Sequence, residues 1–389
     1  MKDNKTYSII PYKNHFIKFS NLLSGRIIYP HYYWDLVSNQ KIPMDWKDWF
    51  NEYNFSINTF FNRPKITHLF YELGFLIENV DAINLEDETI LAIDLEFALI
   101  EPIKLSNPTK KIEFKEIQIP HFKEYESNFK KGFHELTEGN CYQFNLTQKF
   151  DFSINDFSPN DFIKQVWKNK KACGAFGSAT YIPYLNKLFL SNSPECLFQL
   201  KDQCLTSMPI KGTILCESDE ELEQKGNELF SDLKCESELF MIADLIRNDL
   251  SRIENPCAQI LKHKAILRVP KLLHQYSVLG VMLSEKVKVK KIIERMFPGG
   301  SITGAPKKRV LKILRDIEKR DRGFYCGSTL IFFNEMKSAS INIRSAEIDF
   351  SNNLLHYQAG GGITLRSISD NEYLEMLHKV KSFTSLLTL

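Results

Sequence analysis

The spacing of apolar and polar residues predicts both strands and helices, grouped in blocks. Alternating or β-branched runs, typical of strands, occur at residues 188–190, 328–333, 339–348 and 354–358. Several of these runs are joined by tight polar turns, which favours antiparallel pairing. Helical spacing of apolar residues marks longer segments at about 218–253, 306–319 and 369–387. Because the elements come in blocks and do not alternate strictly, the pattern predicts an α+β fold.

Glycine usage divides the chain into two parts. Only Gly25, Gly74 and Gly132 precede Gly139, so close backbone approaches are concentrated further along the chain. A polar segment containing proline, residues 107–111, reads as an exposed connection. We therefore expect an N-terminal scaffold subdomain at residues 1–111, which has no cluster of catalytic residue types, and a domain that carries the chemistry at residues 112–389.

Composition and charge narrow the classes of function. The 389 residues are 43% apolar and 25% charged, with a formal net charge of +2, so there is no general attraction to nucleic acid or membranes. The eight cysteines stand singly, without the paired spacing of zinc or redox sites. The N-terminus lacks the apolar run of a signal peptide, and the most apolar stretch is interrupted by Asp94, Glu96 and Glu101. These features predict a cytoplasmic protein.

A carboxylate lies on the apolar side of the first predicted helix. Glu238 is in register with Met241, Ile242 and Leu245. Burial of an unpaired charge is prohibitive, so Glu238 either pairs with a buried cation or binds a hard metal ion. The charged and amide residues of 244–249 are better explained as a hydrogen-bond network at the helix end.

The last predicted helix offers two more carboxylates close to a run of glycines. Ser369 and Glu372 have the spacing of a capping box, and Glu375 and Lys379 have the spacing of an ion pair on one face. Upstream, Gly360, Gly361 and Gly362 expose backbone N–H groups that suit a carboxylate or phosphate. A plain bulge or turn explains the glycines equally well.

A glycine-rich loop at residues 298–306 runs into a helix with proline in its first turn, which indicates a second anion site. The loop is not a nucleotide P-loop, and no G-x-G-x-x-G follows a strand, so ATP and NAD are poorly supported. Arg344 falls among apolar residues of a predicted strand. Its guanidinium is either paired in the core or directed at an anionic substrate.

Two further segments carry a lysine and a glutamate. Lys211 lies in a segment bounded by Pro209 and Gly212, after a strand-like run at 204–208, and Glu195 follows Ser193-Pro194. Taken alone, both segments read as turns. A lysine acts as a nucleophile when desolvation or nearby cations lower its pKa, and a carboxyl group donates protons well when its pKa is raised. One pocket containing both groups would be a site of covalent catalysis.

Taken in order, these segments resemble the chorismate-binding enzymes. That family includes the large subunits of anthranilate and aminodeoxychorismate synthases, and isochorismate and salicylate synthases. The resemblance covers about residues 120–383 and rests on segments 193–195, 209–213, 238–249, 297–307, 340–348 and 359–379. It implies a large layered αββα fold in which two antiparallel sheets pack together.

The resemblance also implies a site. Glu238 and Glu375, supported by Glu372, would be the ligands of a Mg²⁺ ion that also holds the ring carboxylate of chorismate. The remaining implied substrate and pocket positions are Arg344, Tyr325, Thr303, Thr213, Gly360, Gly361, Gly362 and Lys379, with His274 as the active-site histidine.

Lys211 separates branches of this family. Anthranilate synthases resemble one another in having alanine here, whereas aminodeoxychorismate synthases have a Pro-Ile-Lys-Gly-Thr stretch. The resemblance therefore implies component I of an aminodeoxychorismate synthase, with Lys211 as nucleophile and Glu195 as proton donor, making 4-amino-4-deoxychorismate for 4-aminobenzoate and folate. Gln143 stands where isochorismate and salicylate synthases have the lysine that activates water.

No nucleophilic Cys–His arrangement resembles that of a glutamine amidotransferase, so ammonia is expected from a separate glutaminase subunit. Two alternatives to the aminodeoxychorismate synthase prediction stay open. One is component I of an anthranilate synthase, and the other is a noncatalytic chorismate-binding subunit.

Overall fold

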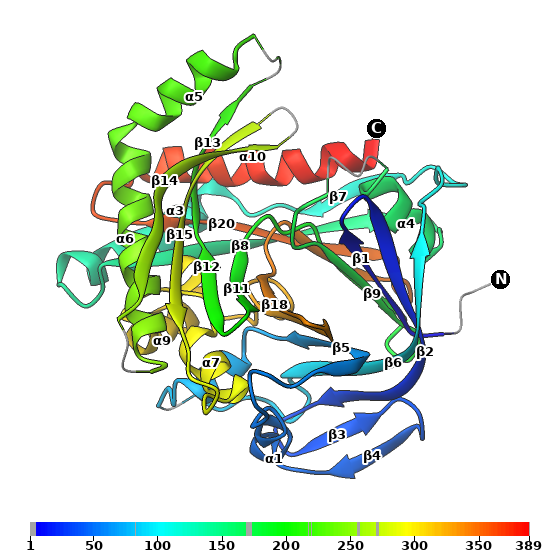
Figure 1. The fold of residues 1–389 in the computed structure, drawn as a ribbon. Helices are drawn as coiled ribbons and strands as arrows, with labels where there is room; N and C mark the ends of the chain where they lie inside the picture. The colour runs from blue at the N-terminus through cyan, green and yellow to red at the C-terminus, as the bar shows by residue number, and fades with distance from the viewer. Residues whose placement is uncertain are drawn as a thin grey trace.

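The computed structural model describes residues 5–388 apart from residues 82, 169–172, 217, 219, 255, 256, 270 and 271. The described chain forms a large antiparallel sheet flanked by helices (Figure 1), which confirms the predicted α+β class. The strands are β1 (Tyr7–Tyr12), β2 (His15–Ile28), β3 (Tyr32–Asp35), β4 (Gln40–Pro43), β5 (Phe61–Leu69), β6 (Ala92–Ile103), β7 (Phe114–Gln118), β8 (Gln143–Ile154), β9 (Ser178–Ile182), β10 (Lys187–Ser191), β11 (Cys196–Lys201), β12 (Cys204–Met208), β13 (Ile210–Leu215), β14 (Gln259–Val269), β15 (Leu272–Met282), β16 (Gly304–Ala305), β17 (Ser328–Asn334), β18 (Met336–Ile341), β19 (Ser345–Asp349) and β20 (Leu354–Ile363).

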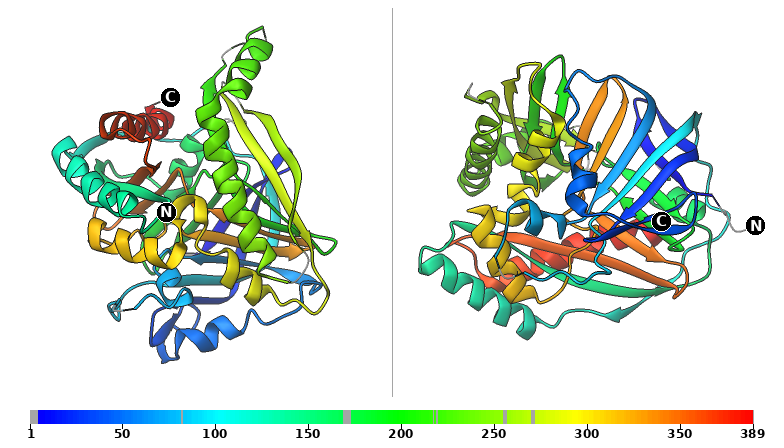
Figure 2. Two further views of the ribbon diagram at one scale, coloured as in Figure 1. Left: turned by 90° about the vertical axis from the view of Figure 1, so that its left-hand side faces the viewer. Right: turned by 90° about the horizontal axis from the view of Figure 1, so that it is seen from below.

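The helices lie mainly outside the sheet. They are α1 (Trp46–Asn51), α2 (Leu73–Ile77), α3 (Phe122–Thr137), α4 (Pro159–Val166), α5 (Leu222–Ser231), α6 (Leu233–Ser251), α7 (Val289–Met296), α8 (Gly300–Thr303), α9 (Lys307–Glu318) and α10 (Ser369–Thr388). Helices α3, α9 and α10 pack against the β8 and β20 layer, whereas α5 and α6 cover β13 and β15. Figure 2 shows α6 lying along the β14–β15 hairpin.

Hydrogen bonding links the strands into one continuous antiparallel path. It runs β7–β8–β20–β19–β10–β9–β1–β2–β6–β5–β17–β18–β11–β12–β15, and β13 and β14 also pair with β15. In Figure 1, β8 and β20 cross the upper half of the molecule, and β3, β4 and β5 lie in the lower half. The sheet therefore curves into the predicted layers.

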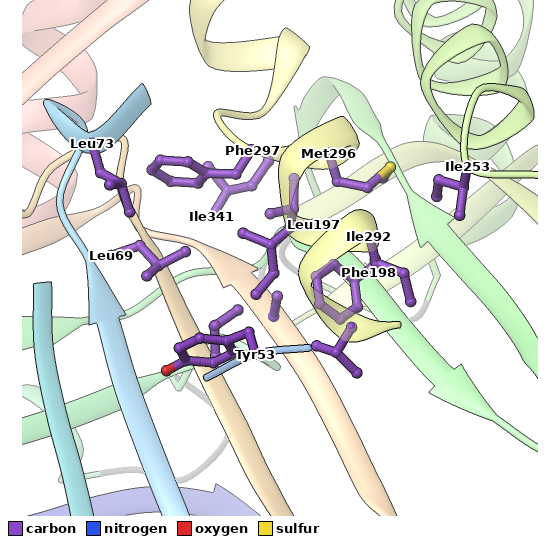
Figure 3. Packing of buried hydrophobic residues seen from close by; sticks show 14 of the residues in the cluster. Tyr53, Leu69, Leu73, Leu197, Phe198, Ile253, Ile292, Met296, Phe297 and Ile341 are labelled. Atoms are coloured by element: carbon purple, nitrogen blue, oxygen red, sulfur yellow. The ribbon is translucent and has the colours of Figure 1, made fainter. Parts of the chain in front are cut away.

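Apolar side chains fill the space between the layers. The largest cluster joins strands β11, β17 and β18 to helices α6 and α7, and it includes Leu69, Phe198, Ile292 and Ile341. Figure 3 shows these residues directed toward one another, with Tyr53 at the edge of the group. A second cluster lies between the β8 and β20 layer and the helices that cover it. Burial of this apolar area, favourable by about 25 cal/mol per Å², holds the layers together.

Most predicted elements are confirmed, but two long segments are interrupted. Residues 339–348 divide at a bend that includes Arg344, so Arg344 is not within a strand as expected; its φ is +50°. The helix expected at 218–253 divides at Asp232, whose backbone is extended. The carboxylate of Asp232 accepts a hydrogen bond from the Cys235 N–H at 2.9 Å, as the first turn of a new helix requires.

The connection at residues 107–111 is irregular and largely exposed, as expected. The strands before it nevertheless pair with strands after it, β1 with β9 and β5 with β17. The division into residues 1–111 and 112–389 stays a prediction. No helix in the described part of the chain is long and apolar enough to cross a membrane.

Candidate active site

Lys211 lies in a strand, not in the turn that its flanking proline and glycine suggested. It pairs with Gln275 in β15, and Thr213 pairs with His274, with a shift of register between them. Gly212, at the shift, has φ +78°, a conformation that favours glycine. The irregularity thus redirects the strand at the lysine. The side chain of Thr213 lies outside the described side chains, so its predicted role stays a prediction.

The Lys211 side chain lies next to the glycine strand, the part of β20 that carries Gly360, Gly361 and Gly362. A Cβ built on Gly362 would lie 3.5 Å from Lys211 Nζ and 2.8 Å from Gln143 Nε2. Gln143 is buried, and its Nε2 has no hydrogen-bond partner among the described residues. Buried donors are nearly always paired in folded proteins, so an unpaired one beside a lysine indicates a place for a ligand.

Glu195 is a buried carboxyl group on which Lys211 acts electrostatically. Its side chain is almost fully buried, and its Oε1 has no hydrogen-bond partner among the described residues. Burial raises the pKa of Glu195, whereas the Ser301 hydroxyl, Lys211 and Arg344 act in the opposite direction. The structure therefore brings the predicted nucleophile and the predicted proton donor into one charge cluster.

His274 and Arg344 belong to the same cluster. Burial and the charge of Arg344 lower the pKa of His274 to about 4, against a hydrogen bond with the Gly212 backbone, so the imidazole is neutral at pH 7. Burial also lowers the pKa of the Arg344 guanidinium, which interacts with Tyr357 and Glu195. Arg344 and Lys211 both act electrostatically on Glu195, and a half-buried guanidinium in such a cluster suits an anionic ligand.

The three glycines form part of a regular strand, β20, so they form neither a bulge nor a turn. Gly360, Gly361 and Gly362 pair in register with residues 145–147 of β8. The pairing of β19 with β20 ends at Tyr357, so the glycine segment extends beyond the part of β20 that pairs with β19. Lys379 Nζ donates to the Gly360 carbonyl on β20 at 2.8 Å.

Helix α10 brings its carboxylates to these glycines. A Cβ built on Gly361 would lie 3.2 Å from Glu372 Oε2 and 3.9 Å from Lys379 Nζ. The predicted ion pair of Glu375 and Lys379 is confirmed at 2.9 Å. The predicted capping box is wrong, because the Ser369 hydroxyl bonds to Asp370, and it is the Ser367 hydroxyl that donates to Glu372 at 2.8 Å.

Glu238 is half-buried on α6, the helix that packs on β13 and β15. The expected apolar stripe is only partly correct, because Ile242 is buried but Met241 is 40% exposed. In the network expected at 244–249, Arg247 pairs with Asp244. Asp249 instead pairs with Lys307 at 3.0 Å, at the start of α9.

The residues predicted to bind a magnesium ion are carboxylates. The described residues contain no group of three or more His, Cys, Asp or Glu side chains arranged for a metal ion. Magnesium commonly takes one or two protein carboxylates and completes its shell with water and substrate oxygens. Glu372 and Glu375, one turn apart on α10 with Glu372 directly at Gly361, fit that requirement chemically.

The glycine-rich loop at residues 298–306 lies against strand β8, which begins at Gln143. Gly304 pairs with Phe144, and a Cβ on Gly304 would lie 2.1 Å from the Gln143 carbonyl oxygen, so the backbone approach itself requires glycine. Thr303 is fully buried in α8, and Tyr325 is buried as well. Among the described contacts, none joins Glu238, Thr303 or Tyr325 directly to Lys211.

Sequence reasoning missed two residues of the cluster. Ser301 acts on Glu195 and Tyr357 acts on Arg344. Ser301 lies inside the glycine-rich loop that was singled out, so the loop itself was a usable signal. Tyr357 lies in a predicted strand, and nothing in its surroundings along the sequence marks it.

The sequence matches the family of chorismate binding enzymes over residues 38–385. The chain belongs to that family. It is 32% identical over 261 residues to component 1 of aminodeoxychorismate synthase from Salmonella typhimurium, a match that covers 66% of this chain and 56% of that protein. It is 28% identical over 275 residues to component 1 of anthranilate synthase from Aquifex aeolicus, covering 68% of this chain and 54% of that one.

A solved structure supports the fold. Anthranilate synthase component I from Streptococcus pneumoniae matches with a TM-score of 0.78 at 21% identity, covering 96% of this chain and 93% of that one. The layered antiparallel sheet with flanking helices is thus the fold of this chain and of that structure.

Proposed function

We propose that this chain is component I of an aminodeoxychorismate synthase, which converts chorismate and ammonia into 4-amino-4-deoxychorismate for 4-aminobenzoate and folate synthesis. Family membership and the 32% identity to component 1 of the Salmonella typhimurium enzyme support this proposal. The residue types in the site favour this member of the family over the others.

The observation that carries the proposal is the position of Lys211. Its Nζ lies beside the backbone of Gly362, next to the Gln143 amide, and acts electrostatically on the buried Glu195 carboxyl. An anthranilate synthase would have alanine in place of the lysine, and an enzyme that activates water would have a lysine in place of Gln143. A noncatalytic binding subunit has no need for a nucleophile beside a buried acid.

In the proposed reaction, the neutral Lys211 amine attacks ring C2 of chorismate. The ring double bonds shift, the bond from C4 to its hydroxyl breaks, and Glu195 gives its proton to the departing oxygen, which leaves as water. Ammonia then adds at C4, the bond between lysine and C2 breaks, and the product leaves with the amine at C4. The overall exchange replaces one hydroxyl with one amino group.

The remaining groups would bind and orient the substrate. Arg344 would pair with a substrate carboxylate, and the neutral His274 beside it would line the pocket without adding charge. Further binding contacts would come from Thr303, Tyr325, Thr213, Lys379 and the backbone of Gly360, Gly361 and Gly362. Glu372 and Glu375 on α10 would hold a magnesium ion, which when bound would supply positive charge for the ring carboxylate, and Glu238 on α6 stays a predicted further ligand. Ammonia would come from a separate glutamine amidotransferase subunit.

Turnover of chorismate with magnesium and ammonium tests the function. The products are separated by chromatography, before and after addition of an aminodeoxychorismate lyase. We expect a nonaromatic amine that the lyase converts to 4-aminobenzoate. Direct formation of anthranilate would contradict the proposal in favour of an anthranilate synthase, and binding of chorismate without turnover would favour a binding subunit.

A further inference from the structure

Arg322 stands at the centre of a buried junction that the proposed chemistry does not use. Its side chain is 1% exposed. Its Nε and Nη2 donate to the two carboxylate oxygens of Glu318 at 2.9 and 2.8 Å, and the guanidinium lies 4.5 Å from the centre of the Tyr71 ring. This planar, two-pronged geometry is one that lysine cannot reproduce.

The other donors of the guanidinium reach two segments of the candidate site. Nη1 donates to the carbonyl of Ile302 at 2.9 Å, between Ser301 and Thr303 in the glycine-rich loop. Nη2 also donates to the carbonyl of Asn145 at 2.6 Å, two residues beyond Gln143 in β8. One side chain therefore links the loop that carries Ser301 and Thr303 to the strand that carries Gln143.

The backbone of Arg322 is fixed as well. Its N–H and that of Gly323 donate to the buried Glu72 carboxylate, Arg322 at 2.7 Å and Gly323 at 3.1 Å. Gln358 Nε2 donates to the Arg322 carbonyl at 2.7 Å from β20. Because Tyr325 follows two residues after Gly323, these bonds also set the place of the Tyr325 segment.

Glu318 extends the junction to the glycine strand. Its Oε1 accepts from the N–H and the hydroxyl of Thr147 at 2.9 and 2.8 Å, and Thr147 pairs with Gly360. A buried ion pair of this kind gives little net stability over well-packed apolar residues. We therefore interpret the ion pair as fixing the relative positions of the segments that it connects.

We propose that Arg322 is a positioning residue: with Glu318 and Glu72 it holds the glycine-rich loop, the Gln143 strand and the Tyr325 segment in the arrangement that binds the substrate. The inference rests on the proposed function of the site, since it assumes that these segments bind chorismate. It does not depend on which product is formed.

The test compares Arg322→Lys with Arg26→Lys. Arg26 also pairs with a buried carboxylate, Asp94 at 2.8 Å, but its acidic partners Asp94 and Glu52 are not predicted site residues. Chorismate consumption, whatever the product, gives kcat and KM, and thermal unfolding gives the stability of each variant. We expect Arg322→Lys to raise KM for chorismate roughly tenfold or more through misplaced contacts. Arg26→Lys should leave KM for chorismate within about twofold of the wild-type value, even if its melting temperature falls as much as that of Arg322→Lys.

Equal changes in KM for the two variants would overturn the proposal, as would a wild-type KM in Arg322→Lys. If Arg322→Lys does not fold, Glu318→Gln takes its place, since the amide keeps the shape of the carboxylate and weakens the junction by one charge. If the wild-type chain consumes no chorismate, calorimetric binding of chorismate to the same variants gives the comparison. The product of the wild-type chain is a separate result, so failure of the proposed function and failure of this inference are distinguishable.

Discussion

At the scale of single residues, the protonation of Glu195 decides whether it can serve as an acid. Because burial raises its pKa, a larger fraction of Glu195 stays protonated near neutral pH than of an exposed glutamate. The rate of a step that uses this proton falls as the pH rises through the raised pKa.

Glu195→Gln therefore removes both the rate and its pH dependence. We expect kcat for chorismate to fall by about 100-fold or more, and the decline toward high pH to disappear. The measurement is kcat across a pH series, with Glu335→Gln, an exposed position, as the control. An unchanged pH profile in Glu195→Gln would exclude this carboxyl group as the proton donor.

At this scale the sequence was informative where residues belong to an ordered set of motifs. Lys211 and Glu195, whose segments read as turns when taken alone, gained their predicted roles from the resemblance to the family, and Lys211 acts electrostatically on Glu195 in the structure. Ser301 and Tyr357 could not be assigned. Their effect arises from distances across the fold, between segments that lie far apart in the sequence, and neither residue type is unusual in a loop or strand.

At the scale of elements, the glycine strand keeps open the space beside Lys211. A Cβ on Gly362 would approach the Gln143 amide at 2.8 Å and the lysine at 3.5 Å, which the far ends of both side chains can avoid only by moving. A methyl group at position 362 would leave the fold intact but would displace the Gln143 and Lys211 side chains from their positions in the site.

Gly362→Ala is accordingly expected to fold and to lower chorismate consumption by about 100-fold. The matched control is Gly226→Ala in α5, where an added Cβ meets nothing within 4 Å. That control should raise the free energy of unfolding by about 0.5–1 kcal/mol and leave the rate unchanged. Full activity in Gly362→Ala would show that the glycine strand does not shape the site.

Element boundaries were less predictable than element types. The apolar pattern continues through residues 339–348, yet the strand ends near Arg344, whose carbonyl accepts a hydrogen bond from the Asn192 N–H at 3.1 Å. That partner lies far away in the sequence, so no local pattern announces the bend. The break at Asp232 had a local signal, because aspartate favours helix starts, but the helical spacing on both sides concealed it.

At the scale of the whole molecule, the N-terminal part is joined to the site more closely than its composition indicated. Strand β5 pairs with β17, and Glu72, at the start of α2, binds the backbone before Tyr325. Such long-range pairing depends on the packing of the entire sheet and cannot be inferred from residues 1–111 alone. The fold class was predictable because blockwise strands and helices reflect local patterns.

Glu72 also links the stability of the fold to pH. Burial, together with the nearby Asp321, raises its pKa from 4.5 to about 7 in the folded chain, so the folded state binds the proton more tightly than the unfolded state. Its contribution to stability is fully present below pH 4.5 and is lost as the pH rises through about 7.

We expect Glu72→Gln to flatten this decline in the free energy of unfolding, which is on the order of 3 kcal/mol. Denaturant unfolding at a series of pH values measures it, with Glu86→Gln, an exposed position, as the control. A slope in Glu72→Gln equal to that of the wild-type chain would assign the decline to other groups.

The central claim is that Lys211 forms a bond to the substrate. The most direct measurement is peptide mass spectrometry after incubation with chorismate and magnesium, without ammonium, followed by an acid quench and digestion. We predict that the peptide containing Lys211 gains the mass of chorismate less one water, that the gain is absent from Lys211→Ala, and that ammonium added before the quench removes it. Consumption of chorismate by the wild-type chain with no mass change at Lys211, or at an undiminished rate in Lys211→Ala, would contradict the account.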